Sequence, residues 1–332
     1  MSTATDVAAR PPTLGRVRAR WAHPAIVANL VAQIAIVVTG GAVRLTGSGL
    51  GCSTWPQCEP GHFTPQAHDA TSIHPYIEFG NRTLTGVLIA IAGIVAVLVW
   101  SDRTRPVGYR RLGLAPVAGV LVQAVLGGIT VLVKLNPAVV ASHLLISMAL
   151  IAASTWLLLR SRDRDGPVRR SVDARTVQLS RALVGLAVVV LALGVVVTGA
   201  GPHSGDDQVG YRFAIDPVVI ARVHSAAVGL FVVTLVALIV RLRRAVTALG
   251  DPATARAGLE AAAPAELGRA VRVGRILLAV TLAQGLIGYV QLLTGLPELV
   301  VLTHMLGAAL LTAAVTWFVA TLRTRTAIDA AD

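Results

Sequence analysis

The chain has 332 residues, of which 55% are hydrophobic and 14% are charged, and its mean hydropathy is +0.71. This composition excludes a soluble protein of this length and indicates an integral membrane protein. The net charge of +12 argues against a nucleic-acid surface, because the basic excess is spread over several separate loops.

Eight apolar runs are each long enough to cross about 30 Å of hydrocarbon at the helical rise of about 1.5 Å per residue. We place these transmembrane segments at residues 24–45, 75–100, 113–134, 139–160, 180–200, 217–240, 271–293 and 298–322. Of the 29 Lys and Arg residues, 24 fall on one side of this arrangement. The other side holds five, namely Arg44, Arg82, Lys134, Arg212 and Arg222. The positive-inside rule therefore predicts that both termini are cytoplasmic.

An internal repeat organises the chain. Residues 120–150 recur without a gap at residues 281–311, displaced by 161 positions. The matched positions include Gln123 with Gln284, Gly127 with Gly288, and His143 with His304. Each copy consists of two apolar runs, a tight break and one histidine early in the second run. This pattern predicts a helical hairpin that carries a buried imidazole, made twice.

The repeat extends outward when the loops are allowed to differ in length. The sequence VVTG at 37–40 reappears at 196–199, and Asn81 falls opposite His224 in the weakest of these pairings. An even number of spans per copy means that both copies enter the membrane from the same side, related by an axis along the membrane normal. We therefore predict an all-α integral membrane fold, in which eight transmembrane helices form two parallel-repeat four-helix bundles.

We divide the chain at the linker between the two copies. The expected parts are a cytoplasmic tail (1–22), an N-terminal four-helix bundle (23–160), a cytoplasmic linker (161–179), a C-terminal four-helix bundle (180–322) and a second cytoplasmic tail (323–332). The first apolar run is longer than the apolar core of a signal peptide, so we expect it to remain as a span.

The two cysteines, Cys52 and Cys58, lie in a long loop rich in Gly and Pro after the first span. Topology puts this loop on the extracytoplasmic, oxidising side, where a disulfide is favoured over free thiols. Metal binding by two thiols alone is less favoured, because a closed tetrahedral site needs four ligands.

Polar residues open the second span. Glu78 and Arg82 are four residues apart, so their side chains share one helix face. One interpretation is a structural ion pair near the membrane interface. The other is a carboxylate inside the bundle that transfers protons. The sequence leaves both interpretations open.

Three histidines form the most informative constellation. A single histidine in a helical bundle is often a hydrogen-bonded core residue, but His224 and His304 lie at matching depths in two helices of the C-terminal bundle. Two imidazoles facing each other across a four-helix core are typical axial ligands of a haem iron. Zinc would require further ligands nearby, which the flanking turns do not supply. Arg222 and Arg82 are candidates to contact haem propionates.

The N-terminal bundle has only His143 at an equivalent position, with Asn81 in place of the second imidazole. An amide is a poor iron ligand, so a haem there is expected to be five-coordinate unless His74 reaches in from the loop. We therefore expect a cofactor half with both axial ligands and a substrate half beside Glu78. The sequence assigns no role to His62, His68 or His203.

These residues together resemble the haem A synthase family, membrane enzymes that oxidise a ring methyl group of haem O to a formyl group. The resemblance covers all eight spans and rests on GGAVRLTGSGLGCSTWPQC, on IEFGNR, on VTGAGPHSGD and on the three histidines. The sequence departs from the family pattern at Asn81, where many members have histidine, and this leaves the ligation of the first-half iron open.

The resemblance implies haem b held by His224 and His304, and haem O bound as substrate in the first half. His143 would be the ligand of the substrate haem, and Glu78 the essential carboxylate. Cys52 and Cys58 match loop cysteines that can form a disulfide in the family. The methyl group would be oxidised by successive hydroxylations through a hydroxymethyl group and a hydrated aldehyde, with oxygen from water and haem b as electron relay.

The expected location is the plasma membrane, with the haem sites near the outer face. The expected partners are haem O, haem O synthase as its supplier, the lipid bilayer and an electron acceptor that the sequence does not identify; self-association is left open. Two alternatives remain. A non-catalytic bis-histidine cytochrome would leave Glu78 and the cysteine loop without a role. A transporter would have polar residues near mid-membrane, whereas the ionisable residues here cluster at the outer ends of the spans.

Overall fold

The computed structural model describes residues 13–66, 72–203, 205–206, 209–249 and 264–325. Eight candidate membrane spans, long and apolar enough to cross a bilayer, lie within these residues. They are α1 (Thr13–Leu45), α2 (His74–Trp100), α3 (Val107–Leu112) continuing into α4 (Ala115–Leu132), α5 (Pro137–Arg162), α6 (Ala174–Ala200), α7 (Pro217–Leu249), α9 (Pro264–Leu293) and α10 (Glu298–Ala320). The prediction of an all-α, eight-span membrane protein is confirmed.

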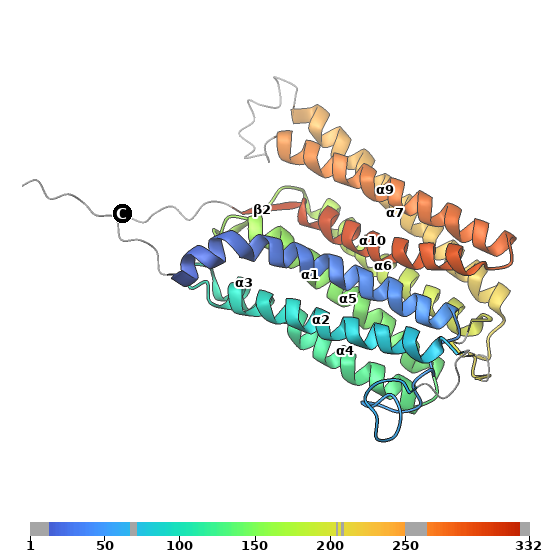
Figure 1. Ribbon diagram of the computed structural model, residues 1–332. Coiled ribbons are helices and arrows are strands. Elements are labelled where there is room, and N and C mark those ends of the chain that lie inside the picture. The colour runs from blue at the N-terminus through green and yellow to red at the C-terminus, as the bar shows by residue number, and fades with distance from the viewer. Residues whose placement is uncertain (1–12, 67–71, 204, 207–208, 250–263, 326–332) are drawn as a thin grey trace, which may run out of the picture.

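The helices pack as two groups of four (Figure 1). In the first group α1 contacts α2 and α5, and α4 contacts the same two helices, which closes a ring. In the second group α6, α7, α9 and α10 make the corresponding contacts. Between the groups, α5 packs against α10, α1 against α10, and α5 against α6. An axis along the membrane normal that relates the two groups remains a prediction.

The two ends of the molecule differ in character. One end, here called the loop end, carries the described parts of the connections, 46–66, 72–73, 133–136, 201–203, 205–206, 209–216 and 294–297. The opposite end, here called the basic end, carries α3, the arginine-rich linker and two short strands (Figure 1). The sequence prediction that the basic end faces the cytoplasm remains a prediction.

Several helices are longer than the predicted spans, and the largest extensions lie at the basic end. Helix α1 begins at Thr13 inside the segment expected to be an irregular tail, and α7 continues to Leu249. Helix α9 begins at Pro264, ahead of the predicted start at 271. Hydropathy marks the part of a helix that lies in hydrocarbon, whereas backbone hydrogen bonding continues into residues that reach water. Residues 1–12 of the predicted tail lie outside the described part of the chain.

The two repeated hairpins turn in the same way. Leu135 and Leu296, which the sequence repeat matches, have φ of 57° and 62°, and each is preceded by another residue with positive φ. The backbone N–H of Leu135 donates to Thr130 O at 2.9 Å, and that of Leu296 donates to Gln291 O at 2.7 Å. These bonds to the fifth residue back are the C-terminal closure that a left-handed residue allows, so each α-helix ends at the same point of its copy.

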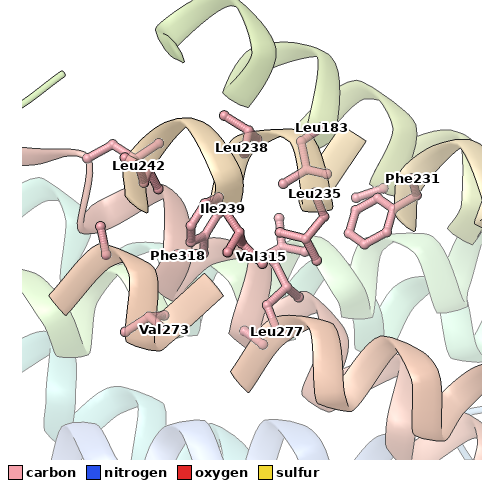
Figure 2. Close-up of a cluster of buried hydrophobic side chains, with 14 of the residues drawn as sticks. Leu183, Phe231, Leu235, Leu238, Ile239, Leu242, Val273, Leu277, Val315 and Phe318 are labelled. Carbon is pink, nitrogen blue, oxygen red and sulfur yellow. The ribbon is translucent and has the colours of Figure 1, made fainter. Parts of the chain in front are cut away.

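The fully buried apolar core occupies the basic half of the molecule. Figure 2 shows its largest cluster, in which side chains of α6, α7, α9 and α10 such as Leu183, Leu235, Leu277 and Phe318 interdigitate. A smaller cluster around Ile26 fills the same level of the first group. Closer to the loop end, the inward-facing positions are mostly only partly buried. The polar side chains of the candidate site lie at that level.

A short antiparallel sheet joins the linker to the C-terminal segment. Strand β1 (Val168–Arg170) pairs with β2 (Arg323–Arg325), and Arg169 lies opposite Thr324. The sequence predicted no strand here, because both segments are short, basic and without alternating apolar residues. The rest of the C-terminal tail, 326–332, lies outside the described residues.

Asp173 caps α6 and generates a testable prediction. Its carboxylate accepts the backbone N–H of Thr176 at 2.7 Å and a bond from Arg241 of α7 at 2.8 Å. Hydrogen bonds from the hydroxyl and the backbone N–H of Thr176 lower the pKa of Asp173. We expect Asp173→Ala to reduce the free energy of unfolding by about 1 kcal/mol at neutral pH.

The pH dependence follows from the direction of the shift. A lowered pKa in the folded state means that the cap stabilises the protein above the ordinary carboxyl pKa and loses this effect as pH falls through the folded value. The difference in thermal unfolding temperature between wild type and variant, measured in detergent, should shrink in acid. A difference that is independent of pH would contradict the assignment.

Candidate functional site

The cysteine loop is closed by a disulfide. Cys52 and Cys58 are bonded to each other, and both side chains are fully buried. This confirms the disulfide that the sequence favoured over free thiols. The disulfide closes this part of the loop into a ring, and the backbone N–H of Cys52 places the ring against Glu78 at the start of α2.

Glu78 lies under this ring and both of its carboxylate oxygens are occupied. Oε2 accepts the backbone N–H of Cys52 at 2.7 Å, and Oε1 accepts Nε and Nη2 of Arg82 at 3.1 and 2.5 Å. The residue is only 5% exposed. The structural ion pair, which was one of the two interpretations of the sequence, is therefore present. The carboxylate is also buried, which the other interpretation requires.

Arg82 extends the network into the loop. Its Nη1 donates to the carbonyl oxygens of Thr54 at 3.0 Å and Gln57 at 3.2 Å, on either side of the turn between the cysteines. Arg82 is thus engaged by Glu78 and by backbone carbonyls, which makes it a tether of the loop. Its predicted contact to a propionate remains a prediction.

Two close approaches fix where the loop sits. A methyl group on Gly128 of α4 would lie 2.4 Å from the ring of Trp55, so only glycine lets this indole rest on the helix. At the other side, Ser48 Oγ lies 2.8 Å from Nδ1 of His74, the first residue of α2. His74 is thus held at the loop and does not reach into the bundle; His68 lies outside the described residues.

The three candidate ligand histidines share one environment. In each case a methyl group on a glycine of the neighbouring helix would lie in contact with Cε1 of the imidazole. The distances are 3.5 Å for Gly127 and His143, 3.4 Å for Gly288 and His304, and 3.3 Å for Gly194 and His224. Among the described residues, Nδ1 of all three rings is buried and has no hydrogen-bond partner of normal geometry.

The rings of the second half nevertheless face backbone dipoles. His224 interacts with the carbonyl of Val190, and His304 with the carbonyl of Gln284. Each of these carbonyls lies one helical turn before the glycine that the ring touches. These carbonyls lie near the rings without accepting a hydrogen bond of normal geometry from Nδ1.

Glutamine side chains hold the histidine helices in register. Gln123 Nε2 donates to the backbone carbonyl of His143 at 2.9 Å, and Gln284 Nε2 donates to that of His304, also at 2.9 Å. The same contact therefore links α4 to α5 and α9 to α10. It sets the height of His143 and His304 relative to the neighbouring helix.

The second half brings two imidazoles together. His224 of α7 and His304 of α10 interact electrostatically across the group. No group of three or more His, Cys, Asp or Glu side chains that could hold a metal ion occurs within the described ranges. Two opposed imidazoles with unbonded nitrogens in partly buried surroundings fit the axial ligation of a haem iron. Arg222 is exposed two residues before His224.

The first half is different at one position. Asn81 accepts a hydrogen bond from Thr39 Oγ1 at 2.8 Å through its Oδ1. A second imidazole is absent at this level of the first half among the described residues, since His74 is held by Ser48. The first half therefore offers His143 alone, with Glu78 and Asn81 near the loop end of α2.

Arg44 is a site residue that the sequence did not single out. It reaches from α1 to the second half, where Nε and Nη2 donate to the carbonyl of His203 at 2.8 and 2.5 Å and Nη2 also donates to Thr198 O at 2.8 Å. No sequence signal predicts such a contact, because its acceptors are backbone atoms more than 150 positions away.

The Glu78 and Arg82 pair yields a testable prediction. Arg82→Gln leaves a buried carboxylate with one partner fewer, so we expect a loss of about 3 kcal/mol in the free energy of unfolding. Adding Glu78→Gln should recover part of this loss, because the uncompensated charge disappears. The measurement is thermal unfolding in detergent, with the exposed Arg222→Gln as the matched control. Strictly additive effects of the two substitutions would contradict a coupled pair.

Comparisons with known proteins agree with this picture. The family model described as cytochrome oxidase assembly protein matches residues 24–204, more than half of the chain. A haem A synthase of Shewanella oneidensis is 33% identical over 151 residues, covering 41% of this chain and 44% of the relative. One of Bacillus pumilus is 38% identical over 129 residues, covering 37% and 40%.

A haem A synthase of Rhizorhabdus wittichii matches a longer stretch, 28% identical over 243 residues, or 61% of this chain and 67% of the relative. The matches to the first two relatives span less than half of each relative's length. The family model nevertheless covers the N-terminal group of helices, the cysteine loop and the start of the second group. The chain belongs to the haem A synthase family of cytochrome oxidase assembly proteins.

Proposed function

We propose that this protein is a haem A synthase, which oxidises a ring methyl group of haem O to a formyl group. The observation that carries the proposal is the difference between the halves. The second half has two opposed imidazoles, whereas the first half has one imidazole and a buried carboxylate. This division suits an enzyme with one resident haem and one haem that is the substrate.

His224 and His304 would hold the iron of haem b. The fit rests on their interaction across the group, on Nδ1 atoms without a hydrogen-bond partner and on the glycine beside each ring. When bound there, haem b supplies a one-electron carrier between the substrate and an external acceptor. The chain's contribution is to place both imidazoles beside the backbone of the neighbouring helices, close to the carbonyls of Val190 and Gln284.

The first half would bind haem O through His143. The Nδ1 of this ring has no hydrogen bond to the described residues, and Gln123 donates to the backbone carbonyl of His143. Asn81 is held by Thr39 and is a poor iron ligand, so the second face of the substrate iron would remain open or weakly bound. Arg82 is the candidate propionate contact in this half, and Arg222 is the candidate in the second half.

Glu78 would accept protons released as the methyl group is hydroxylated. Its position is fixed on two sides, by the N–H of Cys52 and by Arg82, so the carboxylate cannot turn away from its place under the loop. General-base catalysis depends on such positioning. The oxygen atom would come from water, and the electrons would leave through the second half.

The proposal includes a location and partners. The protein would lie in the plasma membrane with both termini in the cytoplasm, so that the loop end and both haem sites face outward. Haem O would be supplied by a haem O synthase, and an electron acceptor would complete the cycle. The alternative is a non-catalytic b-type cytochrome, which the imidazole pair supports equally well but which gives the Glu78 network no task.

Analysis of the bound haems tests the proposal. The protein is purified from a host that makes haem O, and its haems are extracted and identified by chromatography and mass spectrometry. We expect haem A or its hydroxymethyl precursor together with haem b. In Glu78→Gln the haem b content should persist while the oxidised products fall at least about a hundredfold, the typical contribution of a general base.

Glu298→Gln is the matched control, because it removes an exposed carboxylate at the loop end and should leave the products unchanged. Haem b alone in the wild type, with haem O available, would favour the cytochrome. Unchanged products in Glu78→Gln would remove this residue from the mechanism.

The haem b ligands are tested separately by absorption spectroscopy. We expect His224→Ala and His304→Ala each to abolish the low-spin haem b spectrum, since one axial ligand is lost in either case. His62→Ala, which removes an exposed loop imidazole, should leave the spectrum intact. Retention of the low-spin spectrum in both ligand variants would refute the assignment.

A further inference from the structure

A cavity opens between the two groups of helices at the loop end. Its polar side is formed by Arg44 and Arg212, with Thr198 and Tyr211 beside them. Its apolar side is formed by the start of α5, with Leu135, Pro137, Val140, Ala141 and Leu144, and by Val195 of α6. Among the described residues that line it, none carries a carboxylate.

Both guanidinium groups are held in place by backbone carbonyls. Arg44 donates to Thr198 O and His203 O, while Arg212 donates to the carbonyls of Gly201 at 2.7 Å and Pro202 at 2.6 Å. Further bonds from Arg212 to carbonyls of its own loop complete the arrangement. Neither arginine forms an ion pair with a carboxylate in the described part of the chain.

Carbonyl dipoles orient the two arginines without neutralising them. Two like charges beside one cavity repel each other, and that repulsion is relieved by an anion bound between them. Nη1 of Arg44 makes no hydrogen bond to the described residues and is available as a donor. Arginine is suited to this task, because its fork of N–H donors matches the oxygens of a carboxylate or phosphate.

The apolar wall defines the kind of anion. A small hydrophilic anion would gain nothing from the aliphatic side chains of α5, whereas a molecule with an acid group and an apolar body would contact both sides. We propose that this cavity binds the acid group of an anionic amphiphile, with Arg44 and Arg212 as its ligands. The acid is either the phosphate of a membrane phospholipid or the carboxylate of a tetrapyrrole side chain. The proposal does not depend on the proposed catalytic function.

The test uses the full-length protein in a neutral detergent and two pairs of probes. Phosphatidylglycerol is compared with phosphatidylcholine by the shift in thermal unfolding temperature. Metal-free protoporphyrin is compared with its dimethyl ester by porphyrin fluorescence, because a porphyrin without iron cannot be ligated by the histidines. A preference for phosphatidylglycerol identifies a lipid phosphate, and a preference for the free acid identifies a carboxylate; either result supports the site.

Two cavity variants show whether the binding is at this place. Arg212→Gln removes one charge, and Ala141→Phe fills the apolar side while keeping both arginines. Each should weaken the preferred probe by roughly tenfold, the loss of one charge-assisted hydrogen bond or its equivalent. Lys134→Gln is the control, since it removes an exposed positive charge at the same end outside the cavity. Unchanged binding in both cavity variants, or no preference within either pair of probes, would overturn the proposal.

Discussion

The burial of one carboxylate governs the loop end of the first half. A charged group in a membrane span is costly unless it is paired and fully hydrogen-bonded. Glu78 meets this condition through Arg82 and the N–H of Cys52. Because the partners belong to α2 and to the cysteine loop, the requirement that the charge be satisfied also determines where the loop lies. The placement of Trp55 on Gly128 and of Ser48 on His74 is consistent with this anchoring.

Small residues have a comparable role around the imidazoles. Gly127, Gly194 and Gly288 each lie beside an imidazole of the next helix, close enough that an added methyl group would touch the ring. In membranes, where apolar burial does not drive helices together, such close approach is a main source of association. The same packing that joins the helices therefore also orients the candidate ligands. The halves then differ at one position, where α2 supplies the amide of Asn81 and α7 supplies the imidazole of His224.

The sequence predicted the spans well and the contacts between them poorly. Hydropathy identified all eight spans because each is a continuous apolar run. The repeat of residues 120–150 at residues 281–311 predicted two hairpins, and their turns have the same backbone conformation at Leu135 and Leu296. The ion pair between Glu78 and Arg82 followed from helix periodicity. The acceptors of Arg44 and Arg82 did not, because backbone carbonyls in loops leave no mark in the sequence. The extra helical turns at the basic end were missed because hydropathy does not report where hydrogen bonding ends.

The pairing of β1 with β2 has a consequence for assembly. Residues 168–170 leave the ribosome before α6, whereas residues 323–325 follow α10, so the two strands cannot meet until all four helices of the second half have been made. Once formed, the sheet connects the segment before α6 to the segment after α10, so that the two ends of the second half are joined. The sheet can therefore form only after the helices of the half that holds the imidazole pair have all been inserted.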